Sequence, residues 1–487
     1  MNKIRIVLLA CCAILFQAGQ ATGQNALPGF TQPEAGEQLP GGSATHLKRI
    51  NRDAFSHASA NMAFERELDF KVGNGFFKRL WVTAPASTQS ADGLGPLYNA
   101  RSCQRCHLKD GRGHPPTGPD DNAVSMFLRV SIPPQNEDQR ELLGSHRINN
   151  VPDPVYGTQL QDFAIAGHRA EYRMGIRYEE IPVELADGTV VTLRKPSYTA
   201  EDLGYGPLHP QAQLSPRVAP QMIGLGLLEA IDEADILAWA DPDDTDGDGI
   251  SGRPNRVWSR EFQRVMLGRF GHKAGSPSVN EQSQDAFAGD IGISVPLHPD
   301  GWGECTEAQA ACREAPHGGS ESQDGLEADA KVVDLVVFYS RNLAVPMRRD
   351  HDSPEVLAGK RLFHQIGCAS CHRPSYRTRA DESVAPEQRD QLIWPYTDML
   401  LHDMGEGLAD NRPEGVANGR EWRTAPLWGI GLTPVVNGHH LYLHDGRARG
   451  LLEAILWHGG EAQAQRDAVI ALDAADRERL LRFVESL

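Results

Sequence analysis

The sequence lacks a long apolar run beyond its N-terminal end, and it lacks an excess of positive charge. No stretch of about 18 consecutive apolar residues follows the N-terminal segment, which argues against a helical membrane protein and predicts no membrane span. The 487 residues include 48 Lys and Arg against 65 Asp and Glu, for a formal net charge of −17. Because nucleic-acid binding requires a basic surface, the chain is not expected to bind nucleic acid. Hydrophobic residues make up 40% of the chain, so a disordered acidic tail is excluded as well.

The N-terminal end has the order of residues found in export signals. Lys3 and Arg5 precede an apolar stretch over residues 6–16, and small and polar residues follow. This order predicts a signal peptide over residues 1–23 and a periplasmic location. Cys11 leaves a lipoprotein anchor as an alternative.

Cysteines are few outside two short motifs. Of the eight in the chain, Cys11 and Cys12 fall in the predicted signal peptide, and four belong to the motifs described next. The last two, Cys305 and Cys312, lie in a stretch rich in Gly, Glu and Ala. In an oxidising compartment this pair predicts a short-loop disulfide, with two free thiols as the alternative.

Two Cys-Xaa-Xaa-Cys-His motifs carry most of the chemical information. Their residues are Cys103, Cys106, His107, Cys368, Cys371 and His372. Two cysteines spaced in this way present both sulfurs on one face of a helical turn, where they can bond to the vinyl groups of a haem. The histidine that follows can bind the iron. Two such motifs predict two covalently bound haem c groups. A redox-active dithiol would need a βαβ context that we do not find, and the long separation of the pairs disfavours a shared zinc site.

An acidic loop predicts a calcium site. Asp244, Asp246 and Asp248 alternate along the chain and are followed by Gly249. Alternating carboxylates can point at one hard cation. The twelfth position of the loop is Asn255 and not the bidentate glutamate of an EF-hand, so an acidic turn without an ion is the alternative.

Helical patterns surround the second motif and close the chain. Ser353, a proline and a glutamate predict a capped helix over residues 353–363, and Asp473 begins an amphipathic helix that continues to the C-terminus. Residues 331–343 predict a further helix, and residues 188–193 predict a β-hairpin arm. We therefore expect a mainly α fold with two cytochrome c-like haem domains, long loops and a small β-hairpin insertion.

The predicted organisation has three parts. Residues 1–23 form the signal peptide. Residues 24–345 form an N-terminal haem c domain that contains the hairpin insertion and the calcium loop. Residues 346–487 form a C-terminal cytochrome c domain.

Three further stretches give the chain a family resemblance. Residues 93–102, 401–410 and 442–446 resemble the di-haem oxidoreductase family, once labelled predicted thiol oxidoreductases. The chain is similar, more distantly, to bacterial di-haem cytochrome c peroxidases and to the methylamine dehydrogenase maturation enzyme. The resemblance covers most of the chain after the predicted signal peptide.

The resemblance implies different tasks for the two haems. In the peroxidases the N-terminal haem, here on His107, reacts with hydrogen peroxide, and the C-terminal haem, here on His372, relays electrons. A relay iron needs a sixth ligand. His458 lies near the place where relatives have a Met or Tyr ligand, and Met404 is the alternative. The first iron has either an open position or a sixth ligand, with the candidates His114, Met126 and His146.

The resemblance also implies a proton-transferring acid near the first haem. Gln282 and Asp290 lie in a stretch similar to the peroxidase segment that holds a Gln and a Glu beside the open haem. A carboxylate there moves a proton between the peroxide oxygens. Asp replaces Glu and the spacing is shorter, so a capping or surface carboxylate is the alternative. Relatives also hold a calcium between the haems, which would give the acidic loop a role in fixing their geometry.

We predict an exported di-haem c-type oxidoreductase, peroxidase-like, in which electrons pass from the C-terminal haem to the N-terminal haem. The expected electron donor is a small redox protein or cytochrome, and the expected oxidant is a small molecule such as hydrogen peroxide. The alternatives are a non-catalytic electron-transfer protein, thiol–disulfide exchange by free cysteine pairs, and radical transfer through Trp258 or Trp302.

Overall fold

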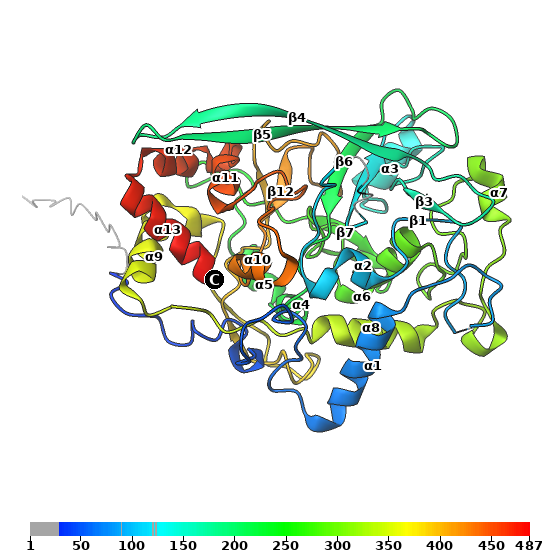
Figure 1. The fold of residues 1–487 in the computed structure, drawn as a ribbon, viewed down its shortest axis with the longest axis horizontal. Coiled ribbons are helices and arrows are strands. Elements are labelled where there is room, and N and C mark those ends of the chain that lie inside the picture. Colours follow the sequence, from blue (N-terminus) through cyan, green and yellow to red (C-terminus); the bar gives the residue numbers. More distant parts are fainter. Residues whose placement is uncertain (1–28, 89, 119–120, 122–123) are drawn as a thin grey trace, which may run out of the picture.

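The computed structural model describes residues 29–487 except residues 89, 119–120 and 122–123 (Figure 1). The predicted signal peptide over residues 1–23 lies outside the described residues. Within the described part of the chain, no helix is long and apolar enough to cross a bilayer.

The α-helices are short and spread along the whole chain. They are α1 (Glu67–Lys78), α2 (Cys103–Cys106), α3 (Glu137–Gly144), α4 (Leu225–Glu229), α5 (Glu233–Leu237), α6 (Val279–Ala286), α7 (Ala310–Arg313), α8 (Ala330–Arg341), α9 (Pro354–Ile366), α10 (Thr433–Asn437), α11 (Leu451–Leu456), α12 (Gln463–Ala471) and α13 (Ala474–Ser486).

The strands pair two by two. They are β1 (Leu97–Tyr98), β2 (Met126–Ser131), β3 (Phe163–Ala164), β4 (Arg173–Glu184), β5 (Val190–Glu201), β6 (Gln213–Val218), β7 (Arg256–Ser259), β8 (Arg264–Leu267), β9 (Tyr376–Arg377), β10 (Leu392–Ile393), β11 (Leu401–Asp403) and β12 (Glu421–Arg423). The pairs β1–β3, β2–β6, β4–β5, β7–β8, β9–β10 and β11–β12 are all antiparallel.

The prediction of a mainly α fold with two cytochrome c-like domains is wrong. Helices hold 29% of the residues and strands 18%, in many small sheets. Most strands have two to six residues, too few for an alternating hydrophobic pattern to stand out in the sequence. The predicted small insertion at residues 188–193 is part of the β4–β5 hairpin, whose strands have 12 residues each.

The helices predicted around the second motif and at the C-terminus are confirmed. Ser353 caps α9 and Asp473 caps α13, each by accepting a hydrogen bond from a backbone N–H of the first turn. The two helices pack together closely because α9 has a glycine at their contact: a Cβ at Gly359 would lie 2.0 Å from the carbonyl oxygen of Arg479. The predicted helix over residues 331–343 is α8.

Two large hydrophobic clusters form most of the core. The first packs α1, α4, α6 and α8 together and includes Trp428 and Val436 from the C-terminal third of the chain. The second surrounds Phe483 in α13 and includes Leu185 and Leu193 from the hairpin. Both clusters draw residues from either side of residue 345, and the division of domains there stays a prediction.

The β4–β5 hairpin forms an arm along one side of the molecule and reaches the C-terminal helices α11 and α12 (Figure 1). At its tip, the N–H of Ala186 donates to the carbonyl of Ile470 over 3.0 Å. The guanidinium of Arg477 in α13 pairs with Asp187 at 2.6 Å. The arm therefore joins the first half of the chain to its last helices.

Candidate functional site

The first motif forms the short helix α2. Ser102 precedes the helix in an extended conformation, and Cys103 and Cys106 lie on its single turn. His107 ends the helix, and its Nδ1 lies 2.8 Å from the carbonyl oxygen of Pro220. A carbonyl can only accept, so Nδ1 carries the proton and Nε2 is the free nitrogen. This is the arrangement of a histidine that binds a metal through Nε2.

The second motif repeats this arrangement with a different backbone. Gly367 ends α9 with a φ of 93°, and residues 368–370 form a 3₁₀ turn. The Nδ1 of His372 lies 3.0 Å from the carbonyl oxygen of Tyr396, which again leaves Nε2 free. Burial lowers the pKa of both His107 and His372 to about 4, so both imidazoles are neutral near pH 7.

The thiols of both motifs are unpaired and hard to ionise. Burial raises the pKa of Cys103 and of Cys368 to about 12. A thiol–disulfide exchange site needs a thiolate, and its attacking cysteine has a lowered pKa. The environment of these cysteines therefore disfavours the thiol exchange alternative.

One cavity of about 510 Å³ connects the two motifs. Its lining contains all six motif cysteines and histidines, and it continues between them along β12. The motif residues fit haem c in three respects: paired thiols on one turn, a neutral imidazole with a free Nε2, and a common apolar cavity. Haem at these positions would be held by Cys103, Cys106 and His107, and by Cys368, Cys371 and His372.

Both candidate sixth ligands of the second iron line the same cavity. His458 follows α11, and its Nδ1 lies 2.8 Å from the carbonyl oxygen of Ala454, which leaves Nε2 free. It is close enough to His372 that its charge contributes, after burial, to lowering the pKa of His372. Met404 lies at the end of β11 and is partly buried against the second core cluster.

None of the candidate sixth ligands of the first iron lines the cavity within the described structure. His114 and His146 lie in loops, and Met126 packs between β2 and β6 against Val218. The histidines that do line it near β12 are His272 and His444, which the sequence analysis did not single out.

Asp290 lies on the cavity wall in a π-helical turn that follows α6. Its Oδ1 accepts a hydrogen bond of 2.7 Å from Nε2 of Gln159. Burial raises the pKa of Asp290 to about 6, against the opposing effects of the Gln159 hydrogen bond and the charge of Arg129. Arg129 lines the cavity as well. An acid with this pKa can exchange a proton near neutral pH.

Gln282 also lines the cavity, from α6, but the amide bonded to Asp290 is that of Gln159. Gln159 lies 131 residues before Asp290 in an irregular segment, where no sequence pattern marked it. Gln159 also donates to the side-chain oxygen of Asn99, so two contacts fix its amide. The structure thus brings Asp290 and Gln282 to one cavity, while Gln159 donates the hydrogen bond to Asp290.

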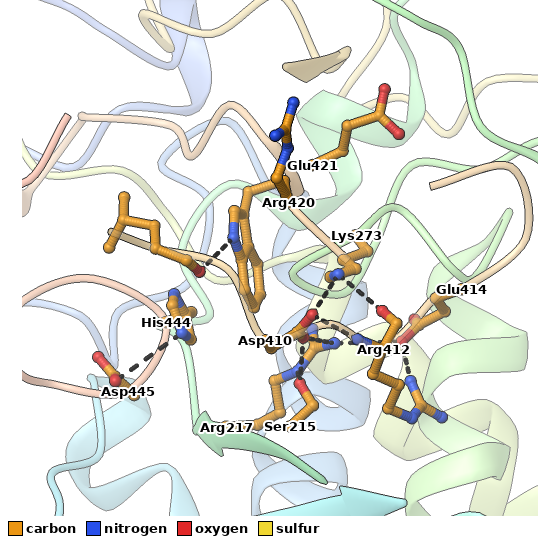
Figure 2. Close-up of polar contacts among 12 residues, drawn as sticks. Ser215, Arg217, Lys273, Asp410, Arg412, Glu414, Arg420, Glu421, His444 and Asp445 are labelled. Carbon is orange, nitrogen blue, oxygen red and sulfur yellow. Dashed lines mark hydrogen bonds and ion pairs between the residues drawn. The ribbon is translucent and has the colours of Figure 1, made fainter. Parts of the chain in front are cut away.

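A buried ionic cluster lies beside the cavity (Figure 2). Lys273 pairs with Asp410 at 2.8 Å, and Arg412 pairs with Glu414 at 2.8 Å. Arg217 lies 3.5 Å from Asp410 and 3.3 Å from Glu414. The three cations of this cluster therefore share two carboxylates.

Trp422 in β12 connects this cluster to the cavity. Its ring stacks on that of His444 with centroids 3.7 Å apart, and Arg217 and Lys273 lie over it at 4.8 and 4.6 Å. Trp258 and Trp302, the aromatics considered for radical transfer, do not line the cavity in the described structure.

His402 lies beside the second motif, with Nδ1 3.6 Å from the sulfur of Cys371. Cys371, Asp398 and His402 bring three potential metal ligands within 4.8 Å of one another. However, Asp398 and Glu461 each approach one ring nitrogen of His402 at 2.7 Å. Both nitrogens are thus occupied, and the group does not form a metal site of its own.

The acidic loop gathers a set of carboxylates different from the predicted one. Asp241, Asp244 and Asp246 bring ligand atoms within 4.8 Å of one another, whereas Asp248 is not part of this group. The N–H of Asp241 donates to the carbonyl of Ser251 over 2.7 Å and closes the loop. Asp241 precedes the alternating run, so no sequence pattern marked it as a candidate ligand.

Comparison with known proteins identifies one family. A family model described as "Di-haem oxidoreductase, putative peroxidase" matches residues 36–487. No curated protein matches the chain. The matched range contains both motifs and the entire lining of the cavity.

Proposed function

This chain belongs to the di-haem oxidoreductase family, and we propose that it reduces hydrogen peroxide with electrons from a small redox protein. The observation that carries the proposal is the cavity that joins the two motifs and has Asp290 on its wall. A carrier that only moves electrons has no need of a buried acid with a pKa near 6 beside one cofactor position.

The cofactors would be two haem c groups. Thioether bonds from Cys103 and Cys106, and from Cys368 and Cys371, would hold them, with His107 and His372 as iron ligands. When bound, the haem irons supply the electron transfer and the chemistry of oxygen-bond cleavage. The protein contributes the fixed imidazoles, the apolar surroundings and the proton transfer.

Electrons would enter at the His372 motif and be used at the His107 motif. His458 is the proposed second ligand on the His372 side, because its Nδ1 is held by the carbonyl of Ala454 and its free Nε2 lies on a residue that lines the same cavity as His372. Met404 is the second candidate, since it lines the same part of the cavity. A closed coordination sphere suits an electron relay, and the reactive side requires an open position for peroxide.

Asp290 would transfer a proton between the two oxygens of hydrogen peroxide. Reduction of hydrogen peroxide to two water molecules consumes two electrons and two protons. The Asp290 carboxylate accepts a proton from one peroxide oxygen and returns it to the other, so that water can leave. Gln159 holds the carboxylate in place through its hydrogen bond to Oδ1.

We also propose that the protein is exported to the periplasm and that its acidic loop binds a calcium ion. A disulfide between Cys305 and Cys312, as predicted, supports an oxidising compartment. Calcium in the acidic loop is supported by the convergence of Asp241, Asp244 and Asp246.

Low-temperature EPR of the purified protein tests the proposal. It is recorded fully oxidised and half-reduced, before and after addition of peroxide. The proposal requires a high-spin ferric signal that peroxide removes. Two low-spin signals that never change would instead identify a non-catalytic electron-transfer protein.

A further inference from the structure

Two arginines on the cavity wall lack an acidic partner. Arg112 follows the first motif, and Arg423 ends β12. Within the described residues, neither forms an ion pair with a carboxylate, although both line the cavity. This contrasts with Arg217 and Lys273 nearby, which both pair with Asp410, Arg217 pairing with Glu414 as well (Figure 2).

Backbone carbonyls hold both guanidinium groups. Arg112 donates from Nε to the carbonyl of Leu441 over 3.1 Å and from Nη2 to that of Leu443. Arg423 donates from Nε to the carbonyl of Gly271 over 3.0 Å and from Nη1 to that of Thr424 over 2.9 Å. Carbonyls satisfy some of the N–H groups but are neutral, so neither guanidinium is in direct contact with a negative charge among the described residues.

The charges of Arg112 and Arg423 both act on His272, which lines the same cavity. Burial and the charges of Arg217, Arg112 and Arg423 together lower the pKa of His272 to about 3. His444 is 7% exposed, and its Nε2 has no hydrogen-bond partner among the described residues, although the carboxylate of Asp445 lies 3.8 Å away (Figure 2). Among the described residues, two arginines without an ion pair and a buried imidazole nitrogen without a hydrogen bond therefore line one cavity.

Such a group of donors is expected to bind an anion. Removing a guanidinium from water without an opposite charge is unfavourable, so two half-buried arginines without an ion pair on one cavity wall indicate that a ligand supplies the negative charge. The planar, forked guanidinium suits a carboxylate in particular. A haem carries two carboxylate side groups in addition to its covalent and iron attachments.

We propose that Arg112 and Arg423 bind carboxylate side groups of the haems, with His444 as an additional donor. The inference rests on the proposed function, since it requires that the motifs carry haem. It assigns residues outside both motifs to cofactor binding.

Each of these two arginines is held by a backbone carbonyl from the other part of the chain. Arg112 comes from the N-terminal part of the chain and is held by carbonyls of residues 441 and 443. Arg423 comes from the C-terminal part and is held by the carbonyl of Gly271. Haem carboxylates bound here would therefore link the two halves of the chain as well as the cofactors.

The test uses the full-length holoprotein with Arg112→Gln, Arg423→Gln and Arg423→Lys, and with Arg52→Gln at an exposed position as the matched control. Haem content is measured first by absorbance. Resonance Raman spectra then report the bending bands of the haem carboxylate groups, and optical redox titration gives the midpoint potential of each haem.

Each glutamine variant should retain two haems, shift a carboxylate band and lower one midpoint potential. A tenfold weaker reduction equilibrium corresponds to about 59 mV for one electron. Arg423→Lys keeps the charge without the fork, so it should shift the band while leaving the potential nearly unchanged. If the Arg423→Gln variant fails to fold, the Arg423→Lys variant still tests the inference. Arg52→Gln should change neither quantity.

Two negative results are distinguishable. A purified wild-type protein without haem would refute the proposed function and this inference with it. Two haems with unchanged bands and potentials in both glutamine variants would refute this inference alone.

Discussion

Replacing Asp290 with asparagine removes the proposed proton acceptor and keeps the shape of the side chain. Gln159 can still donate to the remaining Oδ1, so the loop should stay in place. General acid–base catalysis of this kind contributes about 10² to 10⁴ in rate, or about 3 to 5 kcal/mol of activation free energy. We therefore expect Asp290→Asn to slow the reaction with peroxide at least about 100-fold at neutral pH.

The pH dependence of the reaction rate is a second and more specific test of the role of Asp290. Because burial raises the pKa of Asp290 to about 6, the carboxyl group is mostly ionised at pH 7 and mostly protonated at pH 5. The wild-type rate should fall by about tenfold per pH unit below pH 6, and the asparagine variant should lack this fall. The hydrogen bond from Gln159 lowers this pKa. Gln159→Leu should therefore move the fall in rate to higher pH.

Stopped-flow mixing of the reduced protein with hydrogen peroxide measures these rates over pH 4 to 9. Asp300→Asn, at an exposed position ten residues further along, is the matched control and should behave as the wild type. A wild-type rate and an unchanged pH profile in Asp290→Asn would refute the assignment of the proton step to this residue.

Three further predictions concern the second motif, the packing of α9 against α13, and the acidic loop that contains Asp241. His458→Ala should convert the low-spin EPR signal of the second haem to a high-spin one, whereas Met404→Leu should not; the opposite pattern would make Met404 the ligand. Gly359→Ala places a methyl group against a carbonyl of α13 and should lower the free energy of unfolding by about 1 to 3 kcal/mol in thermal melts. Gly144→Ala, where a Cβ meets nothing within 4 Å, is its control, and equal melting midpoints would contradict the argument. Asp241→Asn should weaken calcium binding roughly tenfold in titration calorimetry, and an unchanged affinity would remove Asp241 from the site.

The sequence predicted the helices that have strong local patterns. It did not predict the short strands, whose formation depends on pairing with a distant strand. Capping residues and apolar spacing identified α9, α13 and α8. Strands of two or three residues, such as β9 and β11, depend on a partner far along the chain, and their own residues contain almost no pattern. Extrapolation from the helices to the whole chain produced the wrong fold class.

The candidate site shows the same division. The motif cysteines and histidines were recognisable because spacing along the chain determines their chemistry. Gln159, Arg423 and His444 were not recognisable, because only the fold brings Gln159 to Asp290 and places Arg423 and His444 on the cavity wall. Asp241 lay just outside a recognisable run, and only the fold of the loop brings it to Asp244 and Asp246.

The arm formed by β4 and β5 has a consequence for biosynthesis. Asp187 at its tip and its partner Arg477 are 290 residues apart, so the arm is synthesised long before the helices that it contacts. Until the C-terminus is synthesised, Leu185 and Leu193 lack the residues of α13 against which they pack, and they stay open to aggregation during translation. A chain that stops before α13 would lack the partner of the arm, and its apolar face would be the first surface offered to chaperones and proteases.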